Sequence, residues 1–319
     1  MSKVLVTGGA GYIGAHVATE LLKSGYDVRI FDDFSNGLER RIEGRFNDVV
    51  RGDICDRESL IGAVTGVDAV IHLAAKKSVG ESVEQPMKYY ENNVGGTLNL
   101  LAAMSLANVR QIVFSSSAAV YAPSEKSAID ENDATEPLSP YGATKLLSEK
   151  LISTVGQAEQ ISHISLRYFN VVGAGEDRLG DNARDNLVPR VFNAVATKIQ
   201  PEIFGTDYPT ADGTCIRDYI HVSDLARAHV SALKKIETGY ISEIYNVGSG
   251  RGYSVKEVFD QMEASMAISL NPQLSPRRAG DSPKLIASIS KIERDLGWKP
   301  LHTLKEMIDS AWKAEQAKS

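Results

Sequence analysis

The fold can be inferred from one stretch near the start of the chain, Val4-Leu5-Val6-Thr7-Gly8-Gly9-Ala10-Gly11-Tyr12-Ile13-Gly14. Its apolar first residues are typical of a buried parallel strand, and residues 15–22 have the apolar spacing of a helix. Between them, Gly9, Gly11 and Gly14 form the pattern G-x-G-x-x-G. These glycines allow a tight turn, close approach of a pyrophosphate and close helix–strand packing, and the helix N-terminus attracts the anion. The stretch therefore predicts a dinucleotide-binding site.

Composition limits the class of protein. The chain has 319 residues, which suits two domains sharing an interface, and its 43% hydrophobic and 24% charged residues are typical of a soluble globular protein. A net charge of −6 gives no indication of a nucleic-acid or anionic-membrane partner. The two cysteines, Cys55 and Cys215, lack metal-ligand spacing, so we expect no metal site, a reduced cytoplasmic protein and two buried thiols. We expect neither a signal peptide, because the first apolar run ends at Val6, nor a transmembrane helix.

Strands and helices alternate along the first half of the chain. Further strands are expected at 27–31, 49–54, 68–75, 111–114 and 163–167, and helices at 87–107 and from Pro140 onward. This alternation predicts an α/β fold with a Rossmann-type doubly wound parallel sheet, whose ligands bind at the carboxyl ends of the strands.

The pattern loosens after about residue 170. A short strand at 244–247 and helices near 224–235 and 255–266 predict a smaller C-terminal α/β substrate domain. We therefore divide the chain into a dinucleotide-binding domain, 1–170, and a substrate domain, 171–319, with some later segments returning to the first.

Two carboxylates follow predicted strands of the first domain. Asp32 lies 18 residues beyond Gly14, where a carboxylate receives the adenosine ribose hydroxyls and repels the additional phosphate of NADP. NAD is therefore the expected cofactor. Asp53 follows the third strand, where it can bond an adenine edge. His72 lies inside an apolar run and is expected to be a packed core residue.

The sequence Tyr141-x-x-x-Lys145 places a phenol and an ammonium one helical turn apart. A tyrosine with a pKa of about 10 is a poor base at neutral pH, but a neighbouring cation lowers that pKa. This is the only such pair among the 12 tyrosines of the chain, and it follows Ser117 at the end of the fifth strand. The set predicts Ser117, Tyr141 and Lys145 as catalytic residues, with Tyr141 as the base for an alcohol.

Several longer motifs accompany this set. They are Lys77-Ser78-Val79-Gly80-Glu81-Ser82, Tyr89-Tyr90-Glu91-Asn92-Asn93-Val94, Ser115-Ser116-Ser117-Ala118-Ala119-Val120-Tyr121, Ser139-Pro140-Tyr141-Gly142, Leu166-Arg167-Tyr168-Phe169-Asn170, Asp207-Tyr208-Pro209-Thr210, Arg217-Asp218-Tyr219-Ile220-His221 and Pro276-Arg277-Arg278-Ala279-Gly280-Asp281. With these motifs the chain resembles, over nearly its whole length, the extended short-chain dehydrogenase/reductase family. Within that family it is most similar to the branch whose members epimerise UDP-hexoses at carbon 4.

The resemblance implies a role for individual residues. The positions that match NAD contacts are Gly8, Gly11, Tyr12, Ile13, Gly14, Asp32, Asp33, Asp53, Ile54, Leu73, Ala74, Ala75, Lys77, Asn92, Ser115, Tyr141, Lys145 and Tyr168. The positions that match UDP-sugar contacts are Lys77, Ser117, Tyr141, Asn170, Asn186, Leu187, Phe204, Arg217, Tyr219, Arg278, Asp281 and Leu285. The two arginines can clamp a diphosphate through charge-assisted bonds.

The resemblance also implies a reaction and an assembly. Tyr141, directly or through Ser117, removes the proton of the carbon-4 hydroxyl while hydride passes to NAD. The 4-keto sugar then turns over and receives the hydride on its other face, which interconverts UDP-galactose and UDP-glucose. A homodimer is expected through helices near 93–107 and 141–155, with Leu98, Leu101, Leu147 and Leu151 on the outer faces.

The chain departs from the family pattern in three places, and alternatives to the expected activity stay open. Ala122 replaces a glycine, the loop 173–186 is shortened, and Leu285 stands where restrictive members have tyrosine. Ala118 and Ala119 replace the acidic pair that a 4,6-dehydratase needs. Epimerisation of UDP-N-acetylglucosamine or UDP-glucuronate stays open, as does a non-catalytic NAD-binding regulator.

Overall fold

The computed structural model describes residues 1–183, 185–278 and 281–318. Seven parallel strands in this part of the chain form one sheet in the order β10-β6-β5-β4-β1-β2-β3. Their bounds are Lys3–Thr7 (β1), Asp27–Asp32 (β2), Asp48–Arg51 (β3), Ala69–His72 (β4), Gln111–Ser117 (β5), Ser162–Tyr168 (β6) and Ser242–Val247 (β10). This order is that of a Rossmann-type doubly wound sheet, and the predicted fold class is confirmed.

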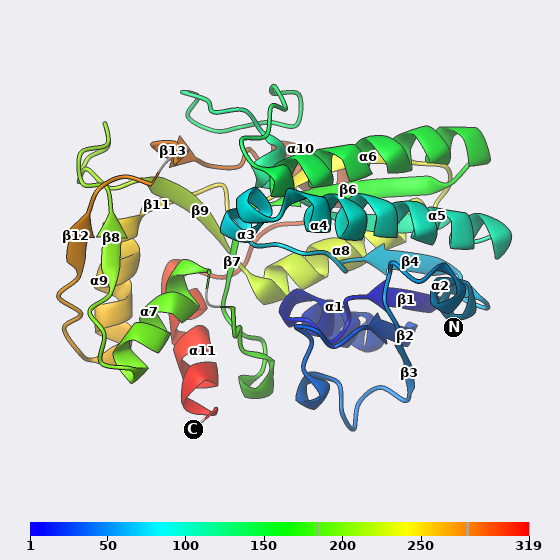
Figure 1. Ribbon diagram of the computed structural model, residues 1–319, viewed down its shortest axis with the longest axis horizontal. Coiled ribbons are helices and arrows are strands. Elements are labelled where there is room, and N and C mark those ends of the chain that lie inside the picture. The colour runs from blue at the N-terminus through cyan, green and yellow to red at the C-terminus, as the bar shows by residue number, and fades with distance from the viewer. Residues whose placement is uncertain (184, 279–280, 319) are drawn as a thin grey trace.

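Helices cover both faces of the sheet (Figure 1). The helices α1, Tyr12–Lys23, and α8, Val222–Ile236, pack together on one face. The helices α2, Arg57–Val64, α5, Gly96–Leu106, and α6, Pro140–Glu159, form the layer on the other.

The sequence of β1 shows why two layers are needed. Val4 and Val6 are buried in the hydrophobic cluster beneath α1 and α8, whereas Leu5 is buried in the cluster beneath α2 and α5. Successive side chains of a strand point to opposite faces, so an unbroken apolar strand must be covered on both sides.

A second unit is built around β9, Ile216–His221, which pairs with β7, Asn170–Val172, β11, Gly252–Ser254, and β13, Lys284–Leu285. Beside it lie the pair β8, Glu202–Phe204, and β12, Gln273–Ser275, and the helices α7, Leu187–Ala196, α9, Val255–Met266, and α11, Leu304–Gln316. These helices share a core that includes Phe192, Phe259, Met262, Met307 and Ile308. Capping boxes fix the starts of α9 and α11.

Shorter elements complete the described structure. They are the 3-10 turns η1, Glu39–Arg41, η3, Ala118–Val120, and η4, Asp177–Leu179, the π-helical turn η2, Tyr90–Gly95, and the helices α3, Val79–Glu84, α4, Pro86–Tyr89, and α10, Ser290–Leu296. The strand β10 comes late in the chain yet pairs with β6 along its full length. The division into two functional domains at residue 170 stays a proposal.

Three predicted elements run beyond the observed ones or are interrupted. The third strand stops at Arg51 because the carboxylates of Asp53 and Asp56 accept bonds from the following backbone N–H groups and start a turn and then α2. The fourth strand stops at His72, so the residues after it belong to a loop. The helix expected at 87–107 is interrupted by η2, and the side chains of Asn92 and Asn93 accept bonds from the Lys76 N–H there.

Two predictions about burial are partly wrong. Cys215 is buried as expected, but Cys55 is exposed because it lies in the turn before α2 rather than in a strand. Leu101 is only 2% exposed and Leu151 packs against the core, so neither lies on an outer face. His72 is a core residue as predicted, with its ring nitrogens bonded to Thr7 and Thr97.

Candidate active site

The glycine-rich turn presents backbone N–H groups at the carboxyl end of β1. Gly8 has a φ of +69°, and a Cβ there would lie 2.8 Å from the backbone nitrogen of Ala74. A Cβ on Gly14 would overlap the carbonyl oxygen of Gly8, so only glycine lets α1 approach the turn. Among the described residues no side chain caps the start of α1, and its first turn carries no acid. Its N–H groups and positive dipole end therefore remain available to an anion.

The carboxylates predicted to hold the adenosine half surround this turn. Asp32, only 6% exposed, accepts bonds from the N–H groups of Ala10 and Phe34 at 2.9 and 2.8 Å. Burial raises the pKa of Asp32, and these two N–H groups oppose the rise. Asp33 and Asp53 are exposed nearby, and each caps the backbone N–H two residues ahead. A dinucleotide diphosphate at α1 and a ribose beside Asp32 fit these residues.

Other predicted cofactor residues line the same edge of the sheet. Leu73, Ala74 and Ala75 follow β4, and the N–H groups of the first two donate to the Thr7 hydroxyl. Ile54 packs directly against Gly96 of α5, where a Cβ would lie 2.5 Å from the isoleucine side chain. The predicted NAD contacts Tyr12, Ile13 and Tyr168 are half-buried, and Lys77 is exposed. Tyr12 reaches toward the second unit, where its hydroxyl donates to the Gly173 carbonyl oxygen at 2.6 Å.

Three consecutive serines at the end of β5 are each fixed by a different element. The hydroxyl of Ser115 lies 2.7 Å from Nε2 of His229 on α8. The Ser116 hydroxyl donates to the carboxylate of Glu149 on α6. Ser117 caps η3 by accepting a bond from the Ala119 N–H, and its hydroxyl also interacts with Tyr141. The strand end is therefore held in a single arrangement beside α6.

The helix α6 brings Tyr141 and Lys145 to these serines. Ser139 caps its N-terminus and Pro140 occupies its first position, which places both side chains in the first turns. The ammonium of Lys145 donates to the Ser115 carbonyl oxygen at 2.8 Å and lies 4.9 Å from the centre of the Phe114 ring. Tyr141 is 8% exposed and Lys145 is 3% exposed. The structure thus brings all three predicted catalytic residues together.

Burial dominates the titration of this pair. It lowers the pKa of Lys145 to about 8, with Glu149 opposing the fall. It also raises the pKa of Tyr141, with the Ser117 hydrogen bond opposing the rise. The expected lowering of the tyrosine pKa is therefore wrong for the protein alone, because desolvation of the phenolate is the largest cause and raises that pKa.

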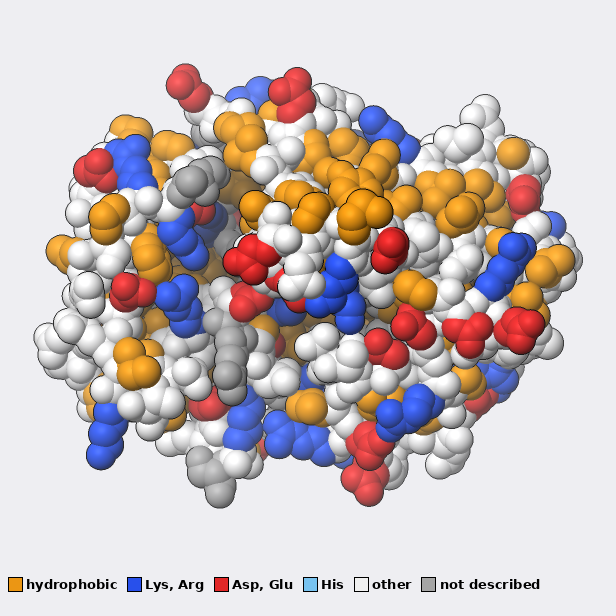
Figure 2. Space-filling model, viewed as in Figure 1, with side chains coloured by type: hydrophobic (Ala, Val, Ile, Leu, Met, Phe, Trp, Pro, Cys, Tyr) orange, Lys and Arg blue, Asp and Glu red, His pale blue; other side chains and the backbone are white. Residues whose placement is uncertain are grey.

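The second unit gathers the predicted UDP residues. Arg217 on β9 donates to the Ser282 carbonyl oxygen at 2.8 Å and to Asp281 at 3.2 Å. Arg278 also contacts Asp281 at 3.2 Å and stacks over the Phe204 ring at 4.9 Å. Figure 2 shows Lys and Arg side chains beside a hollow between the two units. Ala279 and Gly280 of this motif lie outside the described residues.

The remaining predicted substrate residues are spread around this group. Asn170 opens β7 opposite Tyr219 of β9, and Leu285 of β13 pairs in register with Arg217. Asn186 donates to Asp181 at 2.8 Å, and Leu187 begins α7 directly after it. Leu285 also packs against the cluster that contains Ala118, Tyr121 and Phe169. Through Leu285, β13 packs against the turn η3 that follows Ser117.

Sequence reasoning missed the groups behind the catalytic set. His229 and Glu149 contact the serines of β5, and Asp218 accepts bonds from the N–H groups of Ser249, Gly250 and Ala287. Burial raises the pKa of Asp218 to about 6. The spacing of Glu149, four residues beyond Lys145, was a usable signal, whereas His229 and Asp218 depend on contacts between distant segments.

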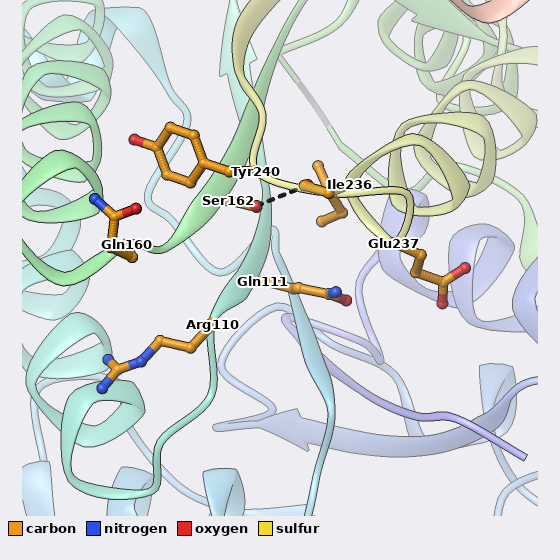
Figure 3. Close-up of a pocket in the computed structure, with 8 residues that line it drawn as sticks. Arg110, Gln111, Gln160, Ser162, Ile236, Glu237 and Tyr240 are labelled. Carbon is orange, nitrogen blue, oxygen red and sulfur yellow. Dashed lines mark hydrogen bonds between the residues drawn. The ribbon is translucent and has the colours of Figure 1, made fainter.

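A cavity of about 210 Å³ lies at the opposite edge of the sheet, between the amino ends of β5 and β6 and the end of α8 (Figure 3). Its lining includes Arg110, which is paired with Glu159 at 3.2 Å, and Ser162, which donates to the Gly239 carbonyl oxygen. Ligands of doubly wound sheets bind at the carboxyl ends of the strands, so this cavity is separate from the candidate site. In the described residues no cluster of three His, Cys, Asp or Glu could hold a metal ion, and no helix is long and apolar enough to cross a membrane.

The doubly wound sheet and the glycine-rich turn at the start of α1 are those of a dinucleotide-dependent enzyme. The model of the NAD dependent epimerase/dehydratase family matches residues 4–248. The chain therefore belongs to the NAD dependent epimerase/dehydratase family.

Individual relatives agree with this assignment. The chain is 41% identical over 318 residues to a UDP-glucose 4-epimerase of Lactobacillus helveticus, covering 98% of this chain and 96% of that protein. It is similar to the crystal structure of UDP-glucose-4-epimerase from Stenotrophomonas maltophila with bound NAD and formylated UDP-arabinopyranose, with a TM-score of 0.95, 39% identity and coverage of 100% and 99% of the two chains. The UDP-glucose 4-epimerase of Bifidobacterium longum in complex with NAD+ and UDP gives a TM-score of 0.92 at 39% identity, covering 99% and 98%.

Proposed function

We propose that this protein is an NAD-dependent isomerase that interconverts UDP-galactose and UDP-glucose at carbon 4. The observation that carries the proposal is the assembly of Ser117, Tyr141 and Lys145 at the carboxyl end of β5, in a fold that also presents the glycine turn after β1, Arg217 on β9 and Arg278 in the segment before β13. The similarity to UDP-glucose 4-epimerases over nearly the whole chain supports it.

The residues of the site have separate tasks in this reaction. NAD, when bound, accepts the hydride of carbon 4 and returns it, and its cationic nicotinamide favours the phenolate of Tyr141. Tyr141 takes the proton of the carbon-4 hydroxyl, directly or through Ser117. Lys145, held at the Ser115 carbonyl, supplies a fixed positive charge beside the phenolate. The same phenol returns the proton when hydride adds to the other face of the keto sugar.

Inversion requires the sugar to turn while the nucleotide stays bound. Arg217 and Arg278 are placed to clamp the diphosphate, Asp281 to accept ribose hydroxyls and Phe204 to contact the uracil ring. We expect the wall near the sugar to consist of small and apolar side chains, including Ala118 and Leu285, which pack in one cluster. Strong binding remote from carbon 4 and weak binding around it is the distribution of contacts that this reaction needs.

A direct assay tests the proposed activity. The purified protein is incubated with UDP-galactose without added NAD, and the products are separated by chromatography. We expect UDP-glucose, together with close to one nicotinamide dinucleotide per chain released on denaturation. A protein that releases mainly NADP, or that binds NAD without converting UDP-galactose, contradicts the proposal. Conversion of UDP-N-acetylglucosamine or UDP-glucuronate alone would indicate one of the alternative substrates.

We further propose that the protein is a cytoplasmic homodimer formed through α5 and α6. Leu98 and Leu147 on these helices are 53% and 42% exposed, and Val83 and Met87 of the neighbouring helices are 63% and 68% exposed. Figure 2 shows apolar side chains gathered over this layer of the molecule. An apolar patch of this kind is typical of an interface between subunits.

The oligomeric state can be measured by light scattering. We expect the mass of a dimer at micromolar concentration, and the mass of a monomer for the variant Leu98→Arg/Leu147→Arg. A matched control, Ile199→Arg, alters an even more exposed apolar residue after α7 and should leave the dimer intact. A wild-type monomer contradicts the proposed interface.

A further inference from the structure

Behind the catalytic pair, α6 carries a third buried polar side chain on the same face. Tyr141, Lys145 and Glu149 follow one another at intervals of four residues, which aligns them along one side of a helix. Glu149 is only 4% exposed, and carboxylates are almost never buried to this degree unless they are paired.

The partners of Glu149 hold it rigidly. Arg167 on β6 forms two parallel bonds to the carboxylate, Nε to Oε1 at 2.9 Å and Nη2 to Oε2 at 2.7 Å, and it is itself 3% exposed. The Ser116 hydroxyl donates to the same carboxylate, and Ser116 pairs in register with Arg167 across β5 and β6. Three elements that form the site, β5, β6 and α6, are thus joined at one carboxylate.

Stability alone gives no reason for this arrangement. A buried ion pair contributes little more than well-packed apolar side chains would in the same volume, because both charges lose their hydration. The position of the pair is more informative: Ser116 lies between Ser115, whose carbonyl holds Lys145, and Ser117, which contacts Tyr141.

We propose that Glu149 is a positioning residue of the active site, whose fixed carboxylate keeps the Lys145 ammonium charged and holds α6 in register with the serines of β5. The proposal rests on the proposed epimerase function for its kinetic consequences, but not for the charge of Lys145. Arg167 anchors Glu149, and neither residue touches the substrate.

The other titratable groups facing this region do not replace Glu149. His72 on β4 and His229 on α8 are buried and neutral, since burial lowers their pKa to about 3 and about 4. Tyr121 after η3 packs on Arg167, and burial raises its pKa to about 12. Tyr168 on β6 is also a neutral phenol, since burial raises its pKa well above the usual range.

The nearby anion Glu131 meets Arg167 only through its backbone carbonyl. In the described residues, Glu149 is the one anion whose charge opposes the desolvation of Lys145.

Two variants separate positioning from simple structural support. Glu149→Gln keeps the size of the side chain and removes its charge, but it leaves Arg167 as an unpaired buried cation. Glu149→Gln/Arg167→Gln removes both charges and restores a neutral interior, so its melting temperature should recover toward wild type. Glu159→Gln on the same helix, where Glu159 pairs with Arg110 at the surface, is the matched control.

The first measurement is the pH dependence of kcat for UDP-galactose. Loss of the Glu149 charge makes Lys145 lose its proton at lower pH, so the ratio of kcat at high pH to kcat at neutral pH should fall about tenfold in both variants. KM and the amount of bound NAD should stay close to wild type. The control variant should follow the wild-type profile.

The second measurement does not depend on activity. The Lys145 side chain is followed by NMR in protein labelled with 13C-lysine, and its signal is assigned with Lys145→Met. We expect its titration midpoint to move to lower pH in both variants. If that midpoint and the shape of the kcat profile are unchanged in the double variant, Glu149 only balances Arg167 and the proposal is overturned. If the wild-type protein lacks epimerase activity, the NMR titration still decides the role of Glu149 while the proposed function fails.

Discussion

At the scale of single residues, the candidate site contains the phenol of Tyr141 in a buried environment that disfavours its ionisation. Burial raises the pKa of Tyr141, and the nearby Lys145 does not reverse that direction in the protein alone. In the proposed reaction the phenol would therefore act as a base only with further positive charge beside it, which the oxidised cofactor would supply.

Removing that oxygen tests the assignment of the base. Tyr141→Phe keeps the buried ring, so folding and nucleotide binding should persist. Turnover should fall by about 10²-fold or more, because no other group takes the proton of the carbon-4 hydroxyl. Turnover is measured by chromatography and UDP binding by calorimetry. Near-normal turnover in this variant would remove Tyr141 from the mechanism.

Leu285 is predicted to set the range of sugars. It pairs in register with Arg217 and packs against the cluster around Ala118, which places it between the nucleotide residues and the catalytic serine. A side chain there limits the space for an N-acetyl group while the sugar turns. Discrimination of this steric kind is typically worth ~1–3 kcal/mol, so we expect a preference for UDP-glucose and UDP-galactose over UDP-N-acetylglucosamine.

Substitutions of Leu285 give this preference a direct test. Leu285→Tyr should suppress turnover of UDP-N-acetylglucosamine and spare UDP-galactose, whereas Leu285→Gly should raise turnover of the N-acetylated sugar. Both substrates are assayed with each variant. Equal proportional changes for the two sugars would show that Leu285 does not line the sugar pocket.

At the scale of elements, sequence predicts best what is determined locally. The strand–glycine turn–helix of residues 4–22 and the spacing of Tyr141 and Lys145 are short-range patterns, and the structure forms both as expected. The interruption by η2 depends on Asn92 and Asn93 reaching the backbone of Lys76, a contact that periodicity does not reveal. The helix α5 is apolar on most sides, so its pattern did not distinguish the exposed Leu98 from the buried Leu101.

Glycine substitutions test the packing of α1 on its turn. A Cβ at Gly14 would overlap the backbone of Gly8, which cannot move without opening the turn. Gly14→Ala should therefore lower the melting temperature and the amount of NAD that co-purifies. Gly62 on α2 has open space around it, so Gly62→Ala should instead stabilise the protein by about 0.5–1 kcal/mol. Both are measured by thermal denaturation and released dinucleotide, and equal effects of the two variants would contradict this account.

At the scale of the whole molecule, contacts between distant segments complete both the sheet and the site. The strand β10 joins the edge of the first sheet from late in the chain, and Asp218 ties β9 to segments near 249 and 287. Such contacts have no local signature, so the predicted UDP residues could be assigned only by resemblance. The structure brings Phe204, Arg217, Arg278 and Asp281 together, and their binding role stays a prediction.

Four buried histidines, located in different parts of the molecule, have lowered pKa values. Burial lowers the pKa of His72 and His221 to about 3, and that of His16 and His229 to about 4. They lie on β4, at the end of β9, and on α1 and α8, and each makes a hydrogen bond as a neutral ring. The unfolded chain, by contrast, binds a proton at each histidine near pH 6.5.

The free energy of unfolding should therefore fall as the pH decreases from about 6.5 toward 4, since the unfolded state binds protons that the folded state refuses. Each such histidine contributes about 1.4 kcal/mol per pH unit within that window, and above pH 6.5 the contribution is complete. Asp218 acts in the opposite direction, because its pKa of about 6 lets the folded state bind a proton first, so it offsets the effect of one histidine. Denaturant unfolding at a series of pH values should show this loss, and His229→Gln should reduce its slope. A free energy of unfolding that is constant between pH 7 and 5 would mean that the folded and unfolded states take up protons equally, which would contradict the lowered histidine pKa values.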